Sequence, residues 1–351
     1  MPQIPVSLAA AQGYSCRVND EKFMRAALEE ARKGIGKTSP NPAVGAVLVR
    51  NGRILARGWH HGAGQPHAEI DALRQTKSAA GATLYVTLEP CSTHGRTPPC
   101  TQAIIQAGIA RVVVGATDPN PHHAGRGFPL LKKHGIEVTS GVLAEECTAL
   151  NRAFNQWIVT GLPWVIAKAG MSLDGRLTRP PGEGQWLTSP ASRKHAQQLR
   201  ARVDAILIGA GTLRADNPRL TVRGHRGARQ PWRVVLTRSG DLPQDAHLFT
   251  DEHRDRTLVF TKKSLRTVLR ELGKRQITSV LIEGGSKVLG EAFDQKLVNE
   301  VCFYLAPIFC GGPQVVIGGK GAPTIEAATY LQNARYEKIG PDVCICGEVT
   351  K

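Results

Sequence analysis

The segment Thr87-Leu-Glu-Pro-Cys-Ser-Thr-His-Gly-Arg-Thr-Pro-Pro-Cys100, with His67-Ala-Glu69 upstream of it, decides how this chain is interpreted. One imidazole and two thiolates suit Zn²⁺, and three protein ligands with water in the fourth position are typical of a catalytic zinc site. The glutamate lies two residues after the histidine, where a carboxylate can move the protons of that water. We therefore predict a zinc site at His67, Cys91 and Cys100, with the glutamate as general acid and base.

The order of these groups matches the motif of zinc-dependent deaminases, H-x-E followed by P-C-x-x-C, except that the second cysteine lies nine positions after the first. Two other interpretations remain open at this point. In the first, His67 and the cysteines are ordinary core residues, and Glu69 is a carboxylate at a helix start. In the second, the metal is a closed structural zinc. Pro90 before the first thiol argues against the former, and no fourth cysteine or histidine lies at a convincing spacing for the latter.

Length and composition predict a globular chain with two domains. A chain of 351 residues corresponds to two domains of about 150 residues each. The apolar runs are strand-sized and far shorter than the roughly 20 residues that cross a bilayer. The formal charge of +16 is scattered along the chain, which favours general background charge or phosphate-bearing small molecules over nucleic acid.

Cysteine usage favours a reducing cytoplasm. Two of the eight cysteines belong to the metal-like motif, and a chain of this length does not need a disulfide scaffold. The other six are expected to be buried or idle thiols, namely Cys16, Cys147, Cys302, Cys310, Cys344 and Cys346.

The first half of the chain is expected to form one α/β domain over residues 19–145, after a disordered or loosely attached extension at 1–18. Asn19-Asp20-Glu21 can cap a first helix, and the turn Asn51-Gly52 predicts a hairpin. Strands that alternate with helices indicate a layered α/β fold. The expected elements are strands at 43–49, 54–58, 82–88, 111–115 and 136–139, with helices at 67–75, 98–107 and 127–134.

A linker helix over 146–162 is expected to lead into a second α/β domain over 163–351. The expected strands lie at 164–169, 205–209, 233–237, 257–260 and 279–283, and the expected helices at 265–272 and 287–293.

Three segments of the second domain carry polar groups where α/β folds bind ligands. Lys168 ends an apolar strand, where an ammonium needs an anionic partner unless its side chain extends to solvent. Gly211-Thr-Leu-Arg-Ala-Asp-Asn-Pro-Arg-Leu-Thr-Val-Arg223 is interpreted as a loop at a strand's carboxyl end. Ile282-Glu-Gly-Gly-Ser-Lys-Val-Leu-Gly290 predicts a glycine turn and a helix start that suits phosphate, although it lacks the G-x-G-x-x-G spacing.

The zinc motif and its flanking segments closely resemble the deaminase half of the bifunctional RibD family of riboflavin biosynthesis. The long cysteine spacing is that family's own form, and Ser39-Pro-Asn-Pro-Ala-Val-Gly45, Asp118-Pro-Asn-Pro121 and Ala124-Gly-Arg-Gly127 add to the resemblance. It implies a cytidine-deaminase-like three-layer domain. It also implies that zinc-bound hydroxide deaminates 2,5-diamino-6-ribosylamino-pyrimidinone 5′-phosphate. The implied substrate contacts are Asn41, His60 and Arg96.

The second half resembles the reductase half of the same family, whose α/β fold is similar to dihydrofolate reductase. The resemblance implies that NADPH reduces the ribosyl group to ribityl, giving 5-amino-6-ribitylaminouracil 5′-phosphate. Lys168 is the candidate catalytic residue, and Asp216 is a second candidate for the proton donor. The implied substrate contacts are Lys168, Gly184, Arg200, Leu220, Arg223 and Glu283. The implied NADPH contacts are Gly170, Trp186, Thr212, Asp216, Gly285, Ser286 and Lys287.

The two halves together predict a bifunctional cytoplasmic enzyme. One half is a zinc hydrolase that acts on cyclic amidines, and the other is an NADP-dependent oxidoreductase. We expect a homo-oligomer with a phosphorylated pyrimidine substrate and with neither nucleic acid nor membrane as a partner. A nucleic-acid-editing deaminase would instead need C-x-x-C spacing and an aromatic or basic groove. A regulatory protein with one decayed half is disfavoured by Glu69, Lys168 and Asp216.

Overall fold

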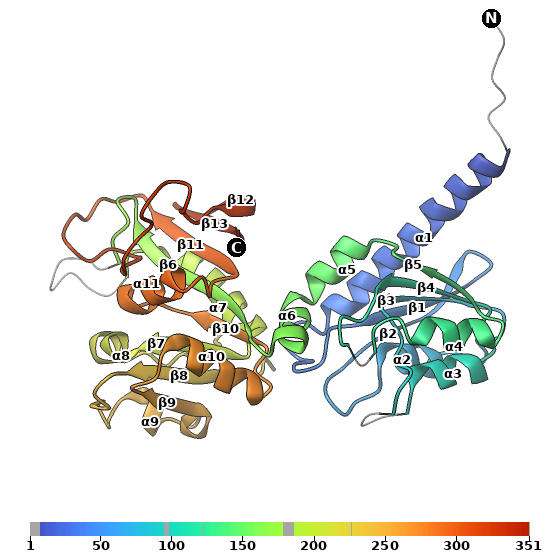
Figure 1. The fold of residues 1–351 in the computed structure, drawn as a ribbon, viewed down its shortest axis with the longest axis horizontal. Helices are drawn as coiled ribbons and strands as arrows, with labels where there is room; N and C mark the ends of the chain where they lie inside the picture. Colours follow the sequence, from blue (N-terminus) through green and yellow to red (C-terminus); the bar gives the residue numbers. More distant parts are fainter. Residues whose placement is uncertain (1–7, 95–97, 122, 178–185, 226, 351) are drawn as a thin grey trace, which may run out of the picture. The chain divides into compact units, whose positions relative to one another are not determined.

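The computed structural model describes residues 8–94, 98–121, 123–177, 186–225 and 227–350 (Figure 1). Contacts divide the chain into two units, Met1–Val159 and Thr160–Lys351, each built around its own sheet. The predicted two-domain α/β organisation is therefore confirmed. Over the residues described, the helices are too short or too polar for any of them to cross a membrane.

The first unit has a five-stranded sheet in the order β2-β1-β3-β4-β5. Its strands are β1 Gly45–Arg50, β2 Arg53–Trp59, β3 Thr83–Leu88, β4 Arg111–Ala116 and β5 Glu137–Ser140. Its helices are α1 Leu8–Arg32, α2 Ala68–Arg74, α3 Cys100–Gln106, α4 Gly127–Lys133, α5 Ala144–Leu150 and α6 Arg152–Thr160. The predicted hairpin at Asn51-Gly52 joins β1 to β2, and both turn residues have the positive φ that a type I′ turn needs.

Helices cover both faces of this sheet, because successive side chains of a strand point to opposite sides. Ala46 and Leu48 of β1 face a core shared with α2, α3 and α4. Val47 and Val49 face a second core shared with α1 and α5. The predicted three-layer arrangement of this unit is confirmed.

The helix α1 begins at Leu8, so residues 8–18 are helical. A disordered or loosely attached extension was expected there. The run Leu8-Ala-Ala-Ala-Gln12 is rich in strong helix formers, which outweighs the expected start at Asn19. Asp20 does not serve as a cap, because its carboxylate accepts hydrogen bonds from Tyr85 and Arg111 at 2.8–2.9 Å. Residues 1–7 lie outside the described residues.

The segment expected as one linker helix forms two helices, α5 and α6, with Asn151 between them. The buried Asn151 side chain accepts a hydrogen bond from the Ala43 amide at 2.8 Å and donates one to the Ala43 carbonyl at 2.9 Å. This pairing attaches the junction between α5 and α6 to the segment that precedes β1. The first unit extends to Val159, so α5 and nearly all of α6 belong to it.

The second unit has an eight-stranded sheet in the order β12-β13-β11-β6-β10-β7-β8-β9. The strands from β11 to β9 in this order are parallel, and β12 and β13 run antiparallel at one edge. The strands are β6 Trp164–Ser172, β7 Ala205–Gly209, β8 Trp232–Thr237, β9 Thr257–Thr261, β10 Ser279–Ile282, β11 Glu300–Ala306, β12 Leu331–Ile339 and β13 Asp342–Val349. The helices are α7 Pro190–Arg202, α8 Ala210–Asp216, α9 His247–Thr250, α10 Leu265–Lys274 and α11 Ser286–Asp294, with a 3₁₀ turn at Arg254–Arg256.

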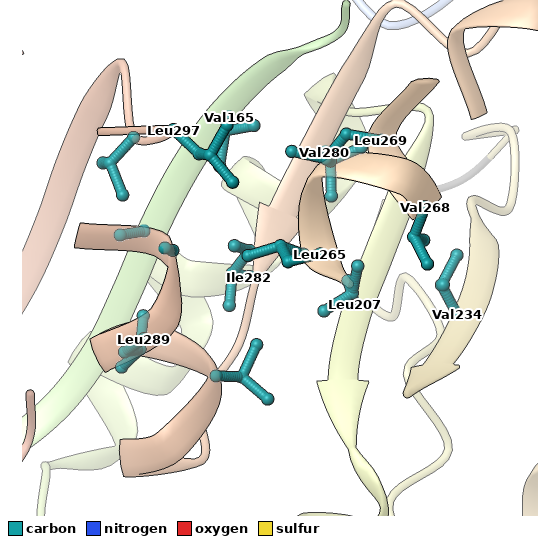
Figure 2. Packing of buried hydrophobic residues seen from close by; sticks show 14 of the residues in the cluster. Val165, Leu207, Val234, Leu265, Val268, Leu269, Val280, Ile282, Leu289 and Leu297 are labelled. Atoms are coloured by element: carbon teal, nitrogen blue, oxygen red, sulfur yellow. The ribbon is translucent and has the colours of Figure 1, made fainter. Parts of the chain in front are cut away.

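The central strands of this sheet are buried on both faces, which explains their continuous apolar runs. Figure 2 shows one face, where Leu207 and Ile282 meet Leu265 of α10 and Leu289 of α11. The opposite face packs against residues of α7 and α8.

Several elements of the second unit were not predicted. The helix α8 occupies the start of the expected loop 211–223. The helix α7 was not expected; Ser189 caps it, and the Ser189 hydroxyl accepts a hydrogen bond from the Ser192 amide. The strands β11, β12 and β13 were also missed. Cys302 and Cys346, expected as idle thiols, lie opposite each other on β11 and β13 and are joined by a disulfide. Chain spacing carries no sign of this pairing.

We predict that Leu207→Ala destabilises the second unit by about 2–5 kcal/mol, because it leaves a cavity at a fully buried position of β7. Native-state hydrogen exchange of the β7, β8 and β10 amides measures this loss. Val259→Ala on β9, at a side chain that is 43% exposed, is the matched control and should change little. Equal protection in the Leu207→Ala variant and the natural chain would contradict the described core.

Candidate functional site

Two helix starts and the segment after β3 bring the predicted zinc ligands of the first unit together. His67 directly precedes α2, Cys91 follows β3, and Cys100 is the first residue of α3. His67 Nδ1 lies 3.6 Å from Cys91 Sγ and 3.2 Å from Cys100 Sγ. All three ligand atoms lie within 4.8 Å of one another. A soft pair of sulfurs with one imidazole fits zinc and leaves the fourth position to a small molecule.

The placement of α2 depends on its close approach to β2. A Cβ at Gly58 would lie 2.3 Å from the Ala72 amide nitrogen, so only glycine allows this contact. The Asp71 carboxylate also accepts a hydrogen bond from the Trp59 amide at 3.0 Å. These contacts hold the helix whose start carries His67 and Glu69.

The two cysteines have different proton affinities. Hydrogen bonding from the Cys100 thiol, assisted by the Cys100 amide at 3.3 Å, lowers the pKa of Cys91 to about 4. The neighbouring Cys91 sulfur in turn raises the pKa of Cys100. A hydrogen bond to Cys91 raises the pKa of His67. The site therefore holds at least one thiolate, the form of cysteine that ligates metals.

Glu69 is buried in the first turn of α2, beside the three ligands. Burial raises its pKa to about 7. A carboxyl group with a pKa near the working pH can both accept and donate a proton, as general acid–base catalysis requires.

Asn41 and His60, the predicted substrate contacts, meet each other next to the zinc ligands. His60 Nδ1 donates to the Pro66 carbonyl at 3.0 Å, so the neutral ring accepts the Asn41 amide on Nε2 at 3.0 Å. Burial lowers the pKa of His60, which keeps the ring neutral. The His60 and His67 rings lie edge to face with centroids 5.2 Å apart. Arg96, the third predicted contact, lies outside the described residues.

Glu89 is a residue of this site whose role sequence reasoning missed. Its buried carboxylate accepts hydrogen bonds from the amides of Asp118, Gly125 and Gly127 at 3.2, 2.8 and 2.9 Å. These bonds tie the segment that carries Cys91 to the start of α4. The available signal was a carboxylate directly after an apolar strand.

In the second unit, Lys168, Arg200 and Glu283 come together from β6, α7 and the end of β10. Arg200 Nε and Nη2 donate to the two Glu283 carboxylate oxygens at 2.5 and 2.9 Å. Lys168 Nζ lies 3.6 Å from Glu283 Oε2. Lys168 was expected at the end of its strand, but β6 continues to Ser172. Of the two alternatives that the sequence left open, an anionic partner and extension to solvent, the structure shows the anionic partner.

Glu283 stays ionised although its side chain is only 7% exposed. Burial by itself raises the pKa of this group, but the charges and hydrogen bonds of Arg200 and Lys168 outweigh burial and lower the pKa to about 2. The resulting cluster carries one net positive charge from these three groups, which suits an anionic ligand.

Five of the predicted cofactor contacts lie on α8 and at the start of α11. Thr212 and Asp216 lie on α8, and Gly285 precedes Ser286 and Lys287, the first residues of α11. A Cβ at Gly285, whose φ is +80°, would lie 3.1 Å from Thr212 Oγ1, so the turn before α11 closely approaches α8.

The remaining predicted positions are more dispersed. Gly170 lies in β6 beside Thr188, and the exposed Trp186 ring packs under the Arg193 guanidinium. Leu220 is buried in the core that α8 covers. Arg223 is exposed, and its charge acts on Arg200 and Glu283. Gly184 lies outside the described residues.

Tyr304 of β11 is a further neighbour of Lys168 that the sequence did not indicate. Lys168 Nζ lies 6.0 Å from the centroid of its ring, and its hydroxyl is 2.9 Å from His195 Nδ1. The strand β11 was not predicted, so no signal placed this ring beside the lysine.

Two family descriptions match the chain, one in each half. "Cytidine and deoxycytidylate deaminase zinc-binding region" matches residues 17–116, and "RibD C-terminal domain" matches residues 163–345. The riboflavin biosynthesis protein RibD of Bacillus amyloliquefaciens is 40% identical over 92% of this chain and 95% of the relative. The chain belongs to the RibD family. RibD of Escherichia coli (strain K12) is 39% identical over 93% of this chain and 99% of its own.

Solved structures of RibD proteins share both units. Acinetobacter baumannii RibD superimposes with a TM-score of 0.88 at 35% identity, covering 95% of this chain and 100% of its own. A Thermotoga maritima protein described as a diaminohydroxyphosphoribosylaminopyrimidine deaminase/5-amino-6-(5-phosphoribosylamino)uracil reductase gives 0.86 at 36% identity, covering 95% and 99%. The predicted bifunctional deaminase–reductase of riboflavin biosynthesis, with zinc and NADPH as cofactors, is confirmed at the level of the family.

We predict that Glu283→Gln lowers the reductase kcat/KM by about 10²-fold or more, because breaking a buried ion pair leaves Arg200 and Lys168 uncompensated. Steady-state assays of both activities measure the effect, and deamination should be unchanged. Glu300→Gln in β11 is the matched control, since an amide oxygen can still accept the Trp164 indole N–H. A reductase rate near that of the natural chain would remove Glu283 from the site.

Proposed function

We propose that the two units catalyse consecutive steps on one phosphorylated pyrimidine. The first unit deaminates 2,5-diamino-6-ribosylamino-pyrimidinone 5′-phosphate hydrolytically, and the second reduces the ribosyl group with NADPH. The observation that carries this proposal is the convergence of His67, Cys91 and Cys100 beside the buried Glu69. The Thermotoga maritima relative, whose description names the same two reactions, supports the choice of substrate.

In the deaminase site, each side chain has a distinct role. His67, Cys91 and Cys100 would hold zinc, which supplies a water whose pKa is lowered to about 7. Glu69 takes a first proton from this water and delivers it to the pyrimidine ring nitrogen. It then takes a second proton from the hydroxyl group added to the ring carbon and delivers it to the amino group, which leaves as ammonia. Asn41 would hydrogen-bond the edge of the pyrimidine, and its contact with His60 supports this role.

In the reductase site, charge orients the substrate. Arg200 and Arg223 attract its phosphate, and Glu283 holds the Lys168 ammonium beside the reacting sugar. NADPH supplies the hydride, and Lys168 and Asp216 are the candidates for the accompanying proton. Thr212 and the backbone N–H groups at the start of α11 are suited to the cofactor's phosphates, because a helix N-terminus favours anions.

We further propose that the chain works in the cytoplasm as a homo-oligomer. β12 is the outer strand of its sheet, and Tyr336 on it is 72% exposed. An edge strand that carries an exposed aromatic side chain offers a surface for a second copy, although Arg335, Glu337 and Lys338 make the rest of β12 polar. Light scattering should give a multiple of the monomer mass for the natural chain and a smaller mass for Tyr336→Asp. A monomer at every concentration would contradict this proposal.

Mass spectrometry of the products tests the two reactions. Incubation with the diaminopyrimidinone ribosyl phosphate should replace one amino group by oxygen whether or not NADPH is present. Two further hydrogens should appear only with NADPH. A product that retains both amino groups, in a zinc-loaded enzyme, would argue against the deaminase assignment.

We predict that Glu69→Gln lowers the deamination rate by about 10²- to 10⁴-fold, because it removes the proton carrier. Zinc content by elemental analysis should be unchanged, since the glutamate does not ligate the metal. Reduction of separately supplied deaminated substrate should also persist. Glu89→Gln is the structural comparison, since it perturbs the cysteine loop and should lower zinc content as well. Deamination by Glu69→Gln at the natural rate would defeat the assignment.

A further inference from the structure

Three cysteine sulfurs meet between β11 and β13 of the second unit, in a cluster separate from the zinc ligands. Cys302 and Cys346 are direct cross-strand partners with Cα atoms 4.3 Å apart, and a disulfide joins them. Cys344 lies two residues before Cys346, on the same face of the strand. Its Sγ is 3.5 Å from Cys302 Sγ and 3.6 Å from Cys346 Sγ.

Strand register places this thiol cluster, defined by Cys302, Cys344 and Cys346, beside the reductase site. β11 pairs in parallel with β6, so that Cys302 is the register partner of Lys168. Register partners on neighbouring strands project to the same face of a sheet. The row across the sheet therefore runs from Lys168 through Cys302 to Cys346.

Tyr304 provides a second contact between the thiol cluster and the lysine. Its hydroxyl lies 3.8 Å from Cys302 Sγ, and its ring faces Lys168 Nζ. Its register partner on β13 is Cys344, another member of the thiol cluster. A change in the bonding of Cys302 thus reaches Lys168 through one packed aromatic side chain.

We propose that Cys302 and Cys346 form a reversible redox modification site. A peroxide-class oxidant converts the two thiols to the disulfide, and the closed disulfide lowers the reductase activity. This inference rests on the proposed reductase function for its effect on activity, but the modification itself does not. Cys302 and Cys344 are buried, whereas Cys346 is partly exposed, so the oxidant reaches Cys346 first.

The chemistry balances with hydrogen peroxide as the oxidant. The Cys346 thiolate attacks one peroxide oxygen, the O–O bond breaks, and hydroxide leaves with a sulfenic acid on Cys346. The Cys302 sulfur then attacks the Cys346 sulfur, the S–O bond breaks, and water leaves with the Cys302 proton. A dithiol reductant reverses the step by thiol–disulfide exchange and is itself oxidised to a disulfide.

The surroundings favour a disulfide over a bound metal. Over the residues that the structure describes, this cluster contains sulfur ligands alone, without an imidazole or a carboxylate. Three thiolates would place three negative charges among apolar side chains of the core, which is costly. Burial also raises the pKa of Cys344 to about 11, so that this member stays a neutral thiol.

Peptide mapping of the full-length, zinc-loaded enzyme tests the proposal. After treatment with hydrogen peroxide, we expect a Cys302–Cys346 linked peptide and a fall in reductase kcat/KM of about threefold or more, the size of a coupling through packed side chains. Deamination should be unchanged because zinc protects Cys91 and Cys100. A dithiol reductant should restore the reductase rate and remove the linked peptide.

Single cysteine variants separate the members of the thiol cluster. Cys346→Ser should keep the reduced-state activity and lose both the linked peptide and the response to peroxide. Cys344→Ser should keep the linked peptide, and Cys310→Ser, a cysteine of the same unit outside the cluster, should behave as the natural chain does. Circular dichroism identifies any variant that fails to fold, and Cys302→Ser then replaces Cys346→Ser.

Three outcomes would overturn the inference. The first is that peroxide leaves Cys302 and Cys346 as thiols, and the second is that the linked peptide forms without any change in reductase rate. The third is a second equivalent of zinc or copper that Cys346→Ser removes, which would make the cluster a metal site. If the reduced enzyme lacks reductase activity from the start, the proposed function fails, while the peptide map still reports on the disulfide.

Discussion

Each unit of this chain depends on a buried carboxylate whose charge is set by its neighbours. Burial raises the pKa of Glu69 to about 7, so this group can exchange protons near neutral pH. Glu283 is equally buried, but two cationic side chains lower its pKa to about 2 and keep it ionised. One environment makes a proton carrier, and the other makes a permanent counter-ion that holds Lys168 in place. The same residue type therefore serves two kinds of chemistry.

The sheets provide the geometry for both carboxylates. In the first unit, α2 lies close enough to β2 to require Gly58, and this packing brings His67 to the end of β3, where Cys91 begins its loop. In the second unit, β6, β10 and β11 are parallel neighbours, so Glu283 and Cys302 flank Lys168 on the same face. In the second unit, these side chains meet although they are distant in the sequence, because register partners on neighbouring strands project to the same face of the sheet.

Local signals in the sequence accounted for most of the regular structure and for the family. The Asn51-Gly52 turn, the alternation of strands with helices and the zinc motif all depend on residues close together in the chain. The early start of α1 and the Ser189 cap of α7 are local features that were misjudged, whereas β11 and the break between α5 and α6 depend on distant contacts. The strand β11 takes its place between β6 and β13, and Asn151 breaks a helix by pairing with Ala43.

From residues close together in the chain one could already name the donors offered to a metal and the α/β nature of both halves. For Lys168 they left two alternatives, an anionic partner or extension to solvent. The pairing of Lys168 with Glu283 follows from the folded arrangement, since Glu283 and its partner Arg200 lie far from Lys168 along the chain. The folded arrangement also decided that Glu89 braces the cysteine loop and that Cys302 faces Cys346. The physical reason is that spacing encodes contacts within a helix or a hairpin, whereas strand order and register come from packing the whole sheet.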